Sequence, residues 1–128
     1  MNLPRGVRRM HDLVTQDIPA LYSAALGCVT ATLDEGFGLP MVEAMACGCP
    51  VLGTLRGSLP EVSGEHALLV EPTVSALAEG MRSIVSSPEL RSPTRREAAS
   101  VFVRKYDWDK AAEQLAEVFC LALPLPLP

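Results

Sequence analysis

The chain has 128 residues, with 11 lysines and arginines against 15 aspartates and glutamates, and a formal net charge of −4. This length is typical of a single domain that buries an ordinary apolar core. Hydrophobic residues make up 48% of the chain and charged residues 20%, which excludes intrinsic disorder for most of the chain. The acidic balance argues against a nucleic-acid partner, because phosphate binding needs a positive surface.

No transmembrane segment is expected, because no apolar run approaches the ~20 residues that a membrane-spanning helix needs. Residues 1–9 lack the apolar stretch of a secretory signal. The four cysteines, Cys28, Cys47, Cys49 and Cys120, are too few and too scattered for a disulfide framework. Cys47 and Cys49 have the wrong spacing for a zinc knuckle, and no second ligand pair follows them. We therefore expect four buried thiols, no metal site and a reducing, cytoplasmic location.

The first half of the chain predicts helices that alternate with short apolar strands. Residues 1–16 are polar and basic with weak periodicity, so we expect a ragged N-terminal segment. Asp17 is a candidate N-cap of a short amphipathic helix that ends at Gly27. Residues 28–32 are rich in β-branched side chains and predict a strand. A glycine-containing loop over 33–38 then leads to a helix over 39–46, with Pro40 in its first turn.

The second half begins with two more apolar strands, over 51–54 and 67–70, on either side of a loop or short helical turn at 59–61. Amphipathic patterns then predict three helices: from Val74 to Val85, over about 94–105, and after the N-cap Asp107. The apolar stripe of the last helix consists of Trp108, Ala111, Ala112, Leu115 and Phe119. In the tail 123–128, alternating prolines forbid a helix. We interpret this tail either as a ligand for a proline-binding partner or as a disordered end.

Short apolar strands that alternate with helices predict an α/β fold with a parallel sheet. About three strands are visible, flanked by helices, whereas a complete doubly wound sheet has five or six. The order therefore predicts part of a Rossmann-like domain.

The loop from Asp34 to Gly38 is the first candidate binding site. It leaves the first strand at its carboxyl end, where open parallel sheets bind ligands, and it runs directly into a helix. Exposed backbone N–H groups and the positive end of the helix dipole favour a phosphate there. Gly36 and Gly38 either let the backbone approach a ligand or only close a tight turn.

Glu43 is the second candidate, because it is the one ionisable residue of the helix over 39–46. This helix is apolar on nearly all sides, so we expect Glu43 to be buried. A buried carboxylate needs good hydrogen bonds, which either ligand hydroxyls or an internal amide or arginine would supply. Glu35, in the preceding loop, is either solvated or faces the same cleft.

The motif Glu35-Gly-Phe-Gly-Leu-Pro-Met-Val-Glu43, followed by Ala-Met-Ala-Cys-Gly-Cys-Pro-Val51, carries a family resemblance. It resembles the paired-glutamate signature of retaining glycosyltransferases of the GT-B architecture, family 4, also called glycosyl transferases group 1. The segments 58–62, 67–72 and 106–109 also resemble later parts of that family, so the resemblance covers a partial domain over roughly residues 17–122. The resemblance implies the C-terminal, donor-binding half of a GT-B enzyme, and a nucleotide-diphosphate sugar as the donor substrate.

The resemblance also implies roles for individual residues. Glu35 would contact hydroxyls of the donor sugar and is the candidate catalytic residue. Gly36, Phe37 and Gly38 would present backbone N–H groups to the sugar and diphosphate, and Leu39 would contribute a further amide. Glu43 would bind the ribose hydroxyls of the nucleotide. No metal and no organic cofactor is implied.

The sequence departs from the family pattern in two respects. The acceptor-binding half and the arginine–lysine pair that neutralises the leaving diphosphate are not recognised, and Arg5, Arg8 and Arg9 stand in the wrong context to replace that pair. A diphosphate needs fixed positive charge to depart, so we expect little or no turnover from this chain alone.

Two hypotheses follow for the function. The chain is the donor-binding part of a retaining glycosyltransferase, completed by an N-terminal half or by a partner chain. Alternatively, it is a non-catalytic module that binds a nucleotide sugar, or that pairs with a partner through the bare edge strand of a truncated sheet.

Overall fold

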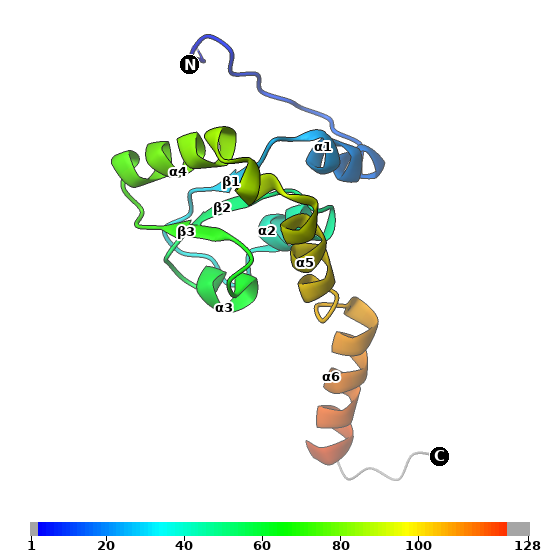
Figure 1. The fold of residues 1–128 in the computed structure, drawn as a ribbon. Helices are drawn as coiled ribbons and strands as arrows, with labels where there is room; N and C mark the ends of the chain where they lie inside the picture. Colours follow the sequence, from blue (N-terminus) through cyan, green and yellow to red (C-terminus); the bar gives the residue numbers. More distant parts are fainter. Residues whose placement is uncertain (1–2, 123–128) are drawn as a thin grey trace.

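The computed structural model describes residues 3–122 and has an α/β architecture (Figure 1). Three parallel strands, β1 (Cys28–Thr30), β2 (Val51–Thr54) and β3 (Leu68–Val70), lie side by side in chain order. In this register Cys28 pairs with Val51, and Leu52 pairs with Leu68. The prediction of a small parallel sheet flanked by helices is confirmed.

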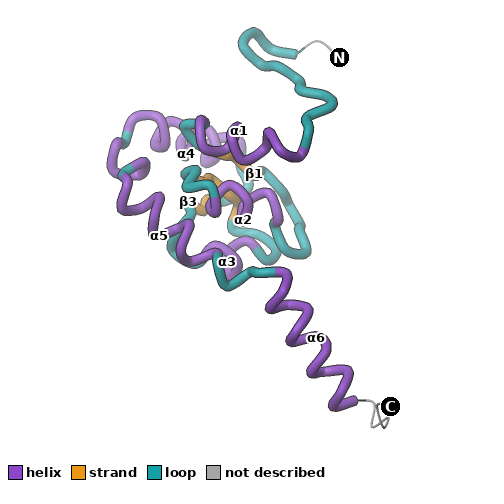
Figure 2. The backbone as a smooth tube through the Cα atoms, turned by 90° about the vertical axis from the view of Figure 1, so that its right-hand side faces the viewer, coloured by secondary structure: helices purple, strands orange, loops and turns teal. Residues whose placement is uncertain are grey.

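Helices cover both faces of the sheet (Figures 1 and 2). Val51 of β2 belongs to a core with α2 (Leu39–Ala46) and α5 (Pro93–Val103). The next residue, Leu52, points to the opposite face, as alternation along a strand requires. There it packs under α4 (Val74–Ser86), and a Cβ added to Gly80 would lie 2.5 Å from Leu52 Cδ1. Gly80 therefore lets α4 approach the sheet closely.

The main core lies between the sheet, α2 and α5. Its buried members are Met41, Ala44, Met45, Cys49, Val51, Leu59, Ala99 and Val103. Two polar contacts hold α5 against the C-terminal end of α2. Arg96 Nε donates to the carbonyl of Gly48 at 2.6 Å, and Ser100 Oγ donates to the carbonyl of Ala46 at 2.9 Å. The first turn of α2 lies against β2, because a Cβ added to Gly53 would lie 2.6 Å from Met41 Cε.

The expected boundaries need small corrections. The first strand ends at Thr30 instead of residue 32, because the chain leaves the sheet there and the carbonyl of Thr32 accepts the Thr54 hydroxyl. Asp17 makes no side-chain cap, because it already belongs to a 3₁₀ turn (Thr15–Asp17) before α1 (Ile18–Ala24). The 59–61 region forms a short helix, α3 (Leu59–Ser63). A second 3₁₀ turn, Pro88–Arg91, precedes α5.

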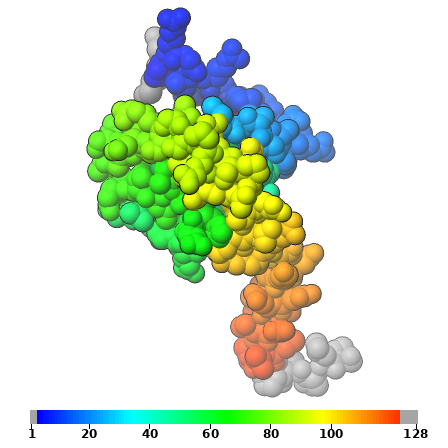
Figure 3. All heavy atoms as spheres, in the orientation of Figure 1, coloured from blue at the N-terminus to red at the C-terminus, as the bar shows by residue number. Residues whose placement is uncertain are grey.

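The last helix, α6 (Trp108–Ala122), projects away from the rest of the molecule (Figures 1 and 3). Asp107 caps it as predicted: its Oδ1 accepts the backbone N–H of Asp109 at 2.8 Å. None of the residues of α6 is buried, and Trp108 is 79% exposed. In the part of the chain that the structure describes, the predicted apolar stripe of α6 therefore lies on the surface.

Residues 3–14 contain no helix or strand, and the predicted proline-rich tail 123–128 lies outside the described residues. The domain boundaries expected at 17 and 122 stay predictions. No helix between residues 3 and 122 combines the length and the apolarity that would let it cross a membrane.

The expectation of four buried thiols is wrong. Cys49 is buried, whereas Cys28 and Cys47 are half-buried and Cys120 is exposed. Cys120 is exposed because it lies on α6, which no other described element covers.

Candidate functional site

The candidate site lies where the loops that follow β1 and β2 meet. The first loop, residues 31–38, leads from β1 into α2, and the second, residues 55–58, leads from β2 into α3. Both begin at the carboxyl ends of parallel strands, where ligands bind in open α/β sheets. The sequence placed Glu35 to Leu39 and Glu43 on the first loop and α2, and the structure has them there.

Ser58 joins the two loops. Its hydroxyl donates to the carbonyl oxygen of Glu35 at 3.1 Å, and its backbone N–H donates to the same oxygen at 3.3 Å. Gly57 has a φ of +55°, and a Cβ added to it would lie 2.8 Å from the Glu35 carbonyl oxygen. Only glycine satisfies both the backbone conformation and this close approach.

Gly38 begins α2 in the left-handed region, with a φ of +92°. Its carbonyl accepts the N–H of Met41 at 3.0 Å, and a Cβ added to it would lie 2.6 Å from Leu59 Cδ2. A tight turn therefore explains this glycine. At Gly36 an added Cβ would meet no atom within 4 Å, so open space lies beside it.

Four successive backbone N–H groups precede and begin α2. In the part of the chain that the structure describes, the N–H groups of Gly36, Phe37, Gly38 and Leu39 donate to no backbone carbonyl. The last two belong to the N-terminus of α2, where unsatisfied N–H groups carry the positive end of the helix dipole. This arrangement can accept an anion such as a diphosphate.

Glu35 precedes these N–H groups in the chain, and Glu43 follows them. Glu35 is half-buried in the loop, and Glu43 is exposed on the second turn of α2. The expected burial of Glu43 is wrong, because α2 packs through one face only and buries Met41, Ala44 and Met45. Exposure removes the argument that Glu43 needs a partner to compensate its burial, but it leaves the carboxylate accessible to a ligand.

Tyr22 of α1 lies beside Glu43. The pKa of its phenol is raised, first because the ring is partly buried and further because Cys28 and Glu43 lie nearby and disfavour a second negative charge. The neutral phenol is a hydrogen-bond donor that the sequence analysis did not place near Glu43.

Phe37 connects the loop to the region that follows α5. Its ring meets the ring of Tyr106 edge-on, with centroids 5.2 Å apart. Lys105 stacks in the same region, with Nζ 3.8 Å from the centroid of the Phe102 ring. The segment 106–109, which carries part of the family resemblance, therefore starts in contact with the candidate site.

The sequence did not predict that Gly57 and Ser58 join the second loop to the loop of Glu35. A signal was present, because a glycine and a small polar residue follow β2, and the carboxyl ends of neighbouring parallel strands meet at one edge of a sheet. Arg56, next to them, is the cation of this loop. Its guanidinium pairs with the carboxylate of Glu71 at 3.2 Å, and both side chains are about half exposed.

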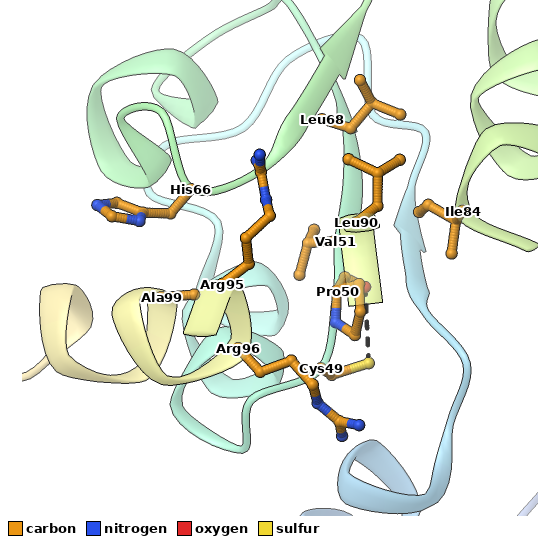
Figure 4. A pocket seen from close by; sticks show the side chains of 10 residues that line it. All are labelled: Cys49, Pro50, Val51, His66, Leu68, Ile84, Leu90, Arg95, Arg96 and Ala99. Atoms are coloured by element: carbon orange, nitrogen blue, oxygen red, sulfur yellow. Dashed lines mark hydrogen bonds between the residues drawn. The ribbon is translucent and has the colours of Figure 1, made fainter. Parts of the chain in front are cut away.

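A cavity of about 20 Å³ lies away from these loops, at the amino end of β2 (Figure 4). It is lined by Cys49, Pro50, Val51, His66, Leu68, Ile84, Leu90, Arg95, Arg96 and Ala99. This volume has room for about one water molecule. Burial raises the pKa of the Cys49 thiol to about 11, so the thiol is neutral at ordinary pH. The cavity is therefore no part of the candidate site.

The fold is that of an incomplete Rossmann-like α/β domain, and the candidate site lies at the carboxyl ends of its parallel strands. The family described as glycosyl transferases group 1 matches residues 2–101, and the chain belongs to that family. The membership of this family that the 35–43 motif predicts is thereby confirmed.

Two relatives illustrate the match. The chain is 33% identical over 117 residues to O-antigen chain mannosyltransferase B of Escherichia coli, an alignment that covers 90% of this chain and 30% of that protein. It is 38% identical over 115 residues to the MMP alpha-(1->4)-mannosyltransferase of Mycolicibacterium hassiacum, covering 84% of this chain and 27% of that protein. The chain thus spans less than a third of the length of these curated relatives.

A solved structure agrees with the fold. Sucrose-phosphate synthase from Thermosynechococcus elongatus is 33% identical and superposes with a TM-score of 0.72, over 80% of this chain and 26% of that chain. The expected fold class, part of a GT-B Rossmann-like domain, is confirmed.

Proposed function

We propose that this chain binds the nucleotide-diphosphate sugar donor of a retaining glycosyltransferase, which transfers the sugar to an acceptor hydroxyl. The observation that carries the proposal is the run of four N–H groups at Gly36, Phe37, Gly38 and Leu39, between the carboxylates of Glu35 and Glu43. Membership of the glycosyl transferases group 1 family supports it. The donor is the substrate, and the proposal includes no metal or organic cofactor.

Each group has a role in this proposal. The N–H groups of the loop bind the sugar and the diphosphate, with the N–H of Gly36, next to Glu35, on the sugar side. The N–H groups that begin α2 and the positive end of its dipole complement the charge of the diphosphate. Glu35 accepts hydrogen bonds from hydroxyls of the donor sugar and is the candidate catalytic residue. Glu43 accepts from the ribose hydroxyls, as an exposed carboxylate one turn into α2 can do.

The transfer reaction needs more than these groups. A departing nucleoside diphosphate develops negative charge that fixed cations must stabilise. Arg56, in the neighbouring loop, is already paired with Glu71. We therefore assign donor binding to this chain and the complete reaction to an assembly with an acceptor-binding half. Buried and half-buried thiols at Cys49, Cys28 and Cys47 support a reducing, cytoplasmic location.

A second candidate function is a non-catalytic module that pairs with a partner chain. Val29 of the edge strand β1 is 43% exposed, and the apolar residues of α6 are exposed as well. Both surfaces are typical of segments that another chain covers. This candidate predicts concentration-dependent association and no binding of nucleotide sugars.

Calorimetric titration separates the two candidates. The 128-residue chain is titrated with UDP, GDP and ADP and with UDP-glucose, GDP-mannose and ADP-glucose. Donor binding predicts that one nucleotide series binds, that Glu43→Ala weakens every member of that series, and that Glu35→Ala weakens the sugar conjugate alone. Glu79→Ala is the matched control, because Glu79 is an exposed helical carboxylate on α4, across the sheet. Equal effects of Glu79→Ala and Glu43→Ala would contradict the proposal.

A further inference from the structure

We propose that Ser58 is a positioning residue of the candidate site, and that it sets the preference for a nucleoside diphosphate sugar over the nucleoside diphosphate alone. The inference rests on the proposed function. Its basis is the double contact in which the hydroxyl and the backbone N–H of Ser58 both donate to the Glu35 carbonyl oxygen, at 3.1 and 3.3 Å.

This contact orients the first N–H group of the candidate site. The peptide bond between Glu35 and Gly36 is planar and trans, so the carbonyl of Glu35 and the N–H of Gly36 point in opposite directions. Because Ser58 holds the carbonyl toward the loop 55–58, the Gly36 N–H points away from that loop. An added Cβ at Gly36 would meet no atom within 4 Å, so a ligand has room beside this residue.

The glycine before Ser58 makes this contact possible. A Cβ at Gly57 would lie 2.8 Å from the Glu35 oxygen and 3.0 Å from the Glu35 nitrogen. The two loops therefore approach each other too closely at Gly57 for a side chain to fit between them, and Ser58 bridges them next to that point.

The hydroxyl of Ser58 makes no hydrogen bond with the helix that it precedes, α3. Ser58 occupies the N-cap position of α3, where serine normally accepts a hydrogen bond from the first turn. Here it makes no such side-chain cap, and the hydroxyl donates across to Glu35 instead. Removal of the hydroxyl should therefore change the Glu35 loop more than it changes α3.

The contact with Ser58 also holds the backbone of Glu35, the residue that contacts the donor sugar in the proposed function. Glu43 and the N–H groups that begin α2 are held by the helix, whereas Glu35 belongs to an irregular loop. Loss of the Ser58 contact should thus affect the sugar end of the donor and leave the nucleotide end unchanged.

The test compares Ser58→Ala, Ser58→Thr and the control Ser100→Ala. Ser100 also donates a hydroxyl hydrogen bond to a distant backbone carbonyl, that of Ala46 at 2.9 Å, but at the far end of α2. Calorimetry measures the Kd of the nucleoside diphosphate that binds the wild-type chain and of its sugar conjugate.

We expect Ser58→Ala to weaken the sugar conjugate about fivefold, the effect of losing one neutral hydrogen bond. The Kd of the nucleoside diphosphate should stay unchanged, Ser58→Thr should restore the wild-type ratio, and Ser100→Ala should preserve it. Equal weakening of both ligands, or the same loss in Ser100→Ala, would overturn the proposal.

A ligand-free measurement separates this proposal from the proposed function. In ¹⁵N relaxation experiments, Ser58→Ala should lower the order parameter of the Gly36 amide toward flexible values below about 0.6, and Ser100→Ala should not. If no probe binds the wild-type chain, the proposed function fails, and the role of Ser58 in donor preference fails with it. If the ligands bind but the Gly36 order parameter and the ligand preference are unchanged in Ser58→Ala, the role of Ser58 alone is wrong.

Discussion

The ring of Phe37 meets the ring of Tyr106 at an interplanar angle of 88°, with centroids 5.2 Å apart. Phe37 lies in the loop that leads into α2, and Tyr106 lies between α5 and α6. Edge-on pairs of this kind are attractive, because the positive ring edge faces the negative ring face. The contact ties the candidate site to the connection before α6.

A double-mutant cycle measures this contact. Phe37→Ala, Tyr106→Ala and the double variant should show a coupling of about 0.5–1 kcal/mol in the free energy of unfolding, determined by urea denaturation. A parallel cycle with Phe37→Ala and Trp108→Ala should show none, because Trp108 is 79% exposed. Additive effects of the Phe37 and Tyr106 substitutions would show that the contact contributes nothing to stability.

Gly57→Ala should destabilise the chain by about 2 kcal/mol. The new Cβ would meet backbone atoms of Glu35 at 2.8 and 3.0 Å, and the φ of +55° is unfavourable for alanine. The free energy of unfolding is measured beside that of Gly36→Ala, where the added Cβ meets open space. We expect Gly36→Ala to unfold like the wild-type chain, and similar losses in both variants would contradict the close approach of the two loops.

Cys49 should make stability depend on pH in the alkaline range. Burial raises the pKa of its thiol from 9.0 to about 11, so the folded state favours the neutral thiol. Its contribution to the free energy of unfolding is complete below pH 9 and is lost as the pH rises toward 11. Urea denaturation from pH 8 to 11 should show this decrease in the wild-type chain and a smaller one in Cys49→Ala.

Alkylation at pH 8 provides the matching control. Cys120 is exposed on α6 and should be labelled by iodoacetamide in the native chain, whereas Cys49 is buried and should react only after unfolding. Rapid labelling of Cys49 in the native chain would contradict its burial.

The isolated 128-residue chain should transfer no sugar. In the loop beside the candidate site, Arg56 pairs with Glu71, and the leaving diphosphate needs a fixed cation of its own. Incubation with the donor that binds and a panel of sugar acceptors should release no nucleoside diphosphate above background. Turnover that Glu35→Ala abolishes would show that this chain is catalytically complete.

Much of the fold follows from local patterns. Apolar periodicity predicted β2, α2 and α4 near their observed bounds, because amphipathic spacing and short apolar runs reflect burial along the chain. The capping of α6 by Asp107 was predictable for the same reason, since a cap depends on atoms within one turn. The position of the 35–43 motif, after one strand and at the start of a helix, was also determined by sequence alone.

The exposure of Glu43 and of the stripe on α6 could not be predicted in this way. Residues 39–46 are apolar on nearly every side, yet only Met41, Ala44 and Met45 are buried, because α2 packs through one face. Likewise Trp108 to Phe119 form an amphipathic pattern, but none of the residues of α6 is buried. A pattern states which residues favour burial, but only the surrounding elements decide which of them are covered.

The contacts that hold the candidate site were decided by the tertiary structure. Ser58 and Glu35 belong to loops after different strands, and Phe37 and Tyr106 come from opposite ends of the domain sequence. Local propensity acts over a few residues, whereas these pairs meet only after the parallel register of β1 and β2 and the packing of α5 on α2 are established. The sequence therefore determined the groups of the motif, Glu35 to Leu39 and Glu43. The long-range packing of the chain brought Ser58 to this motif and determined how its loop is held.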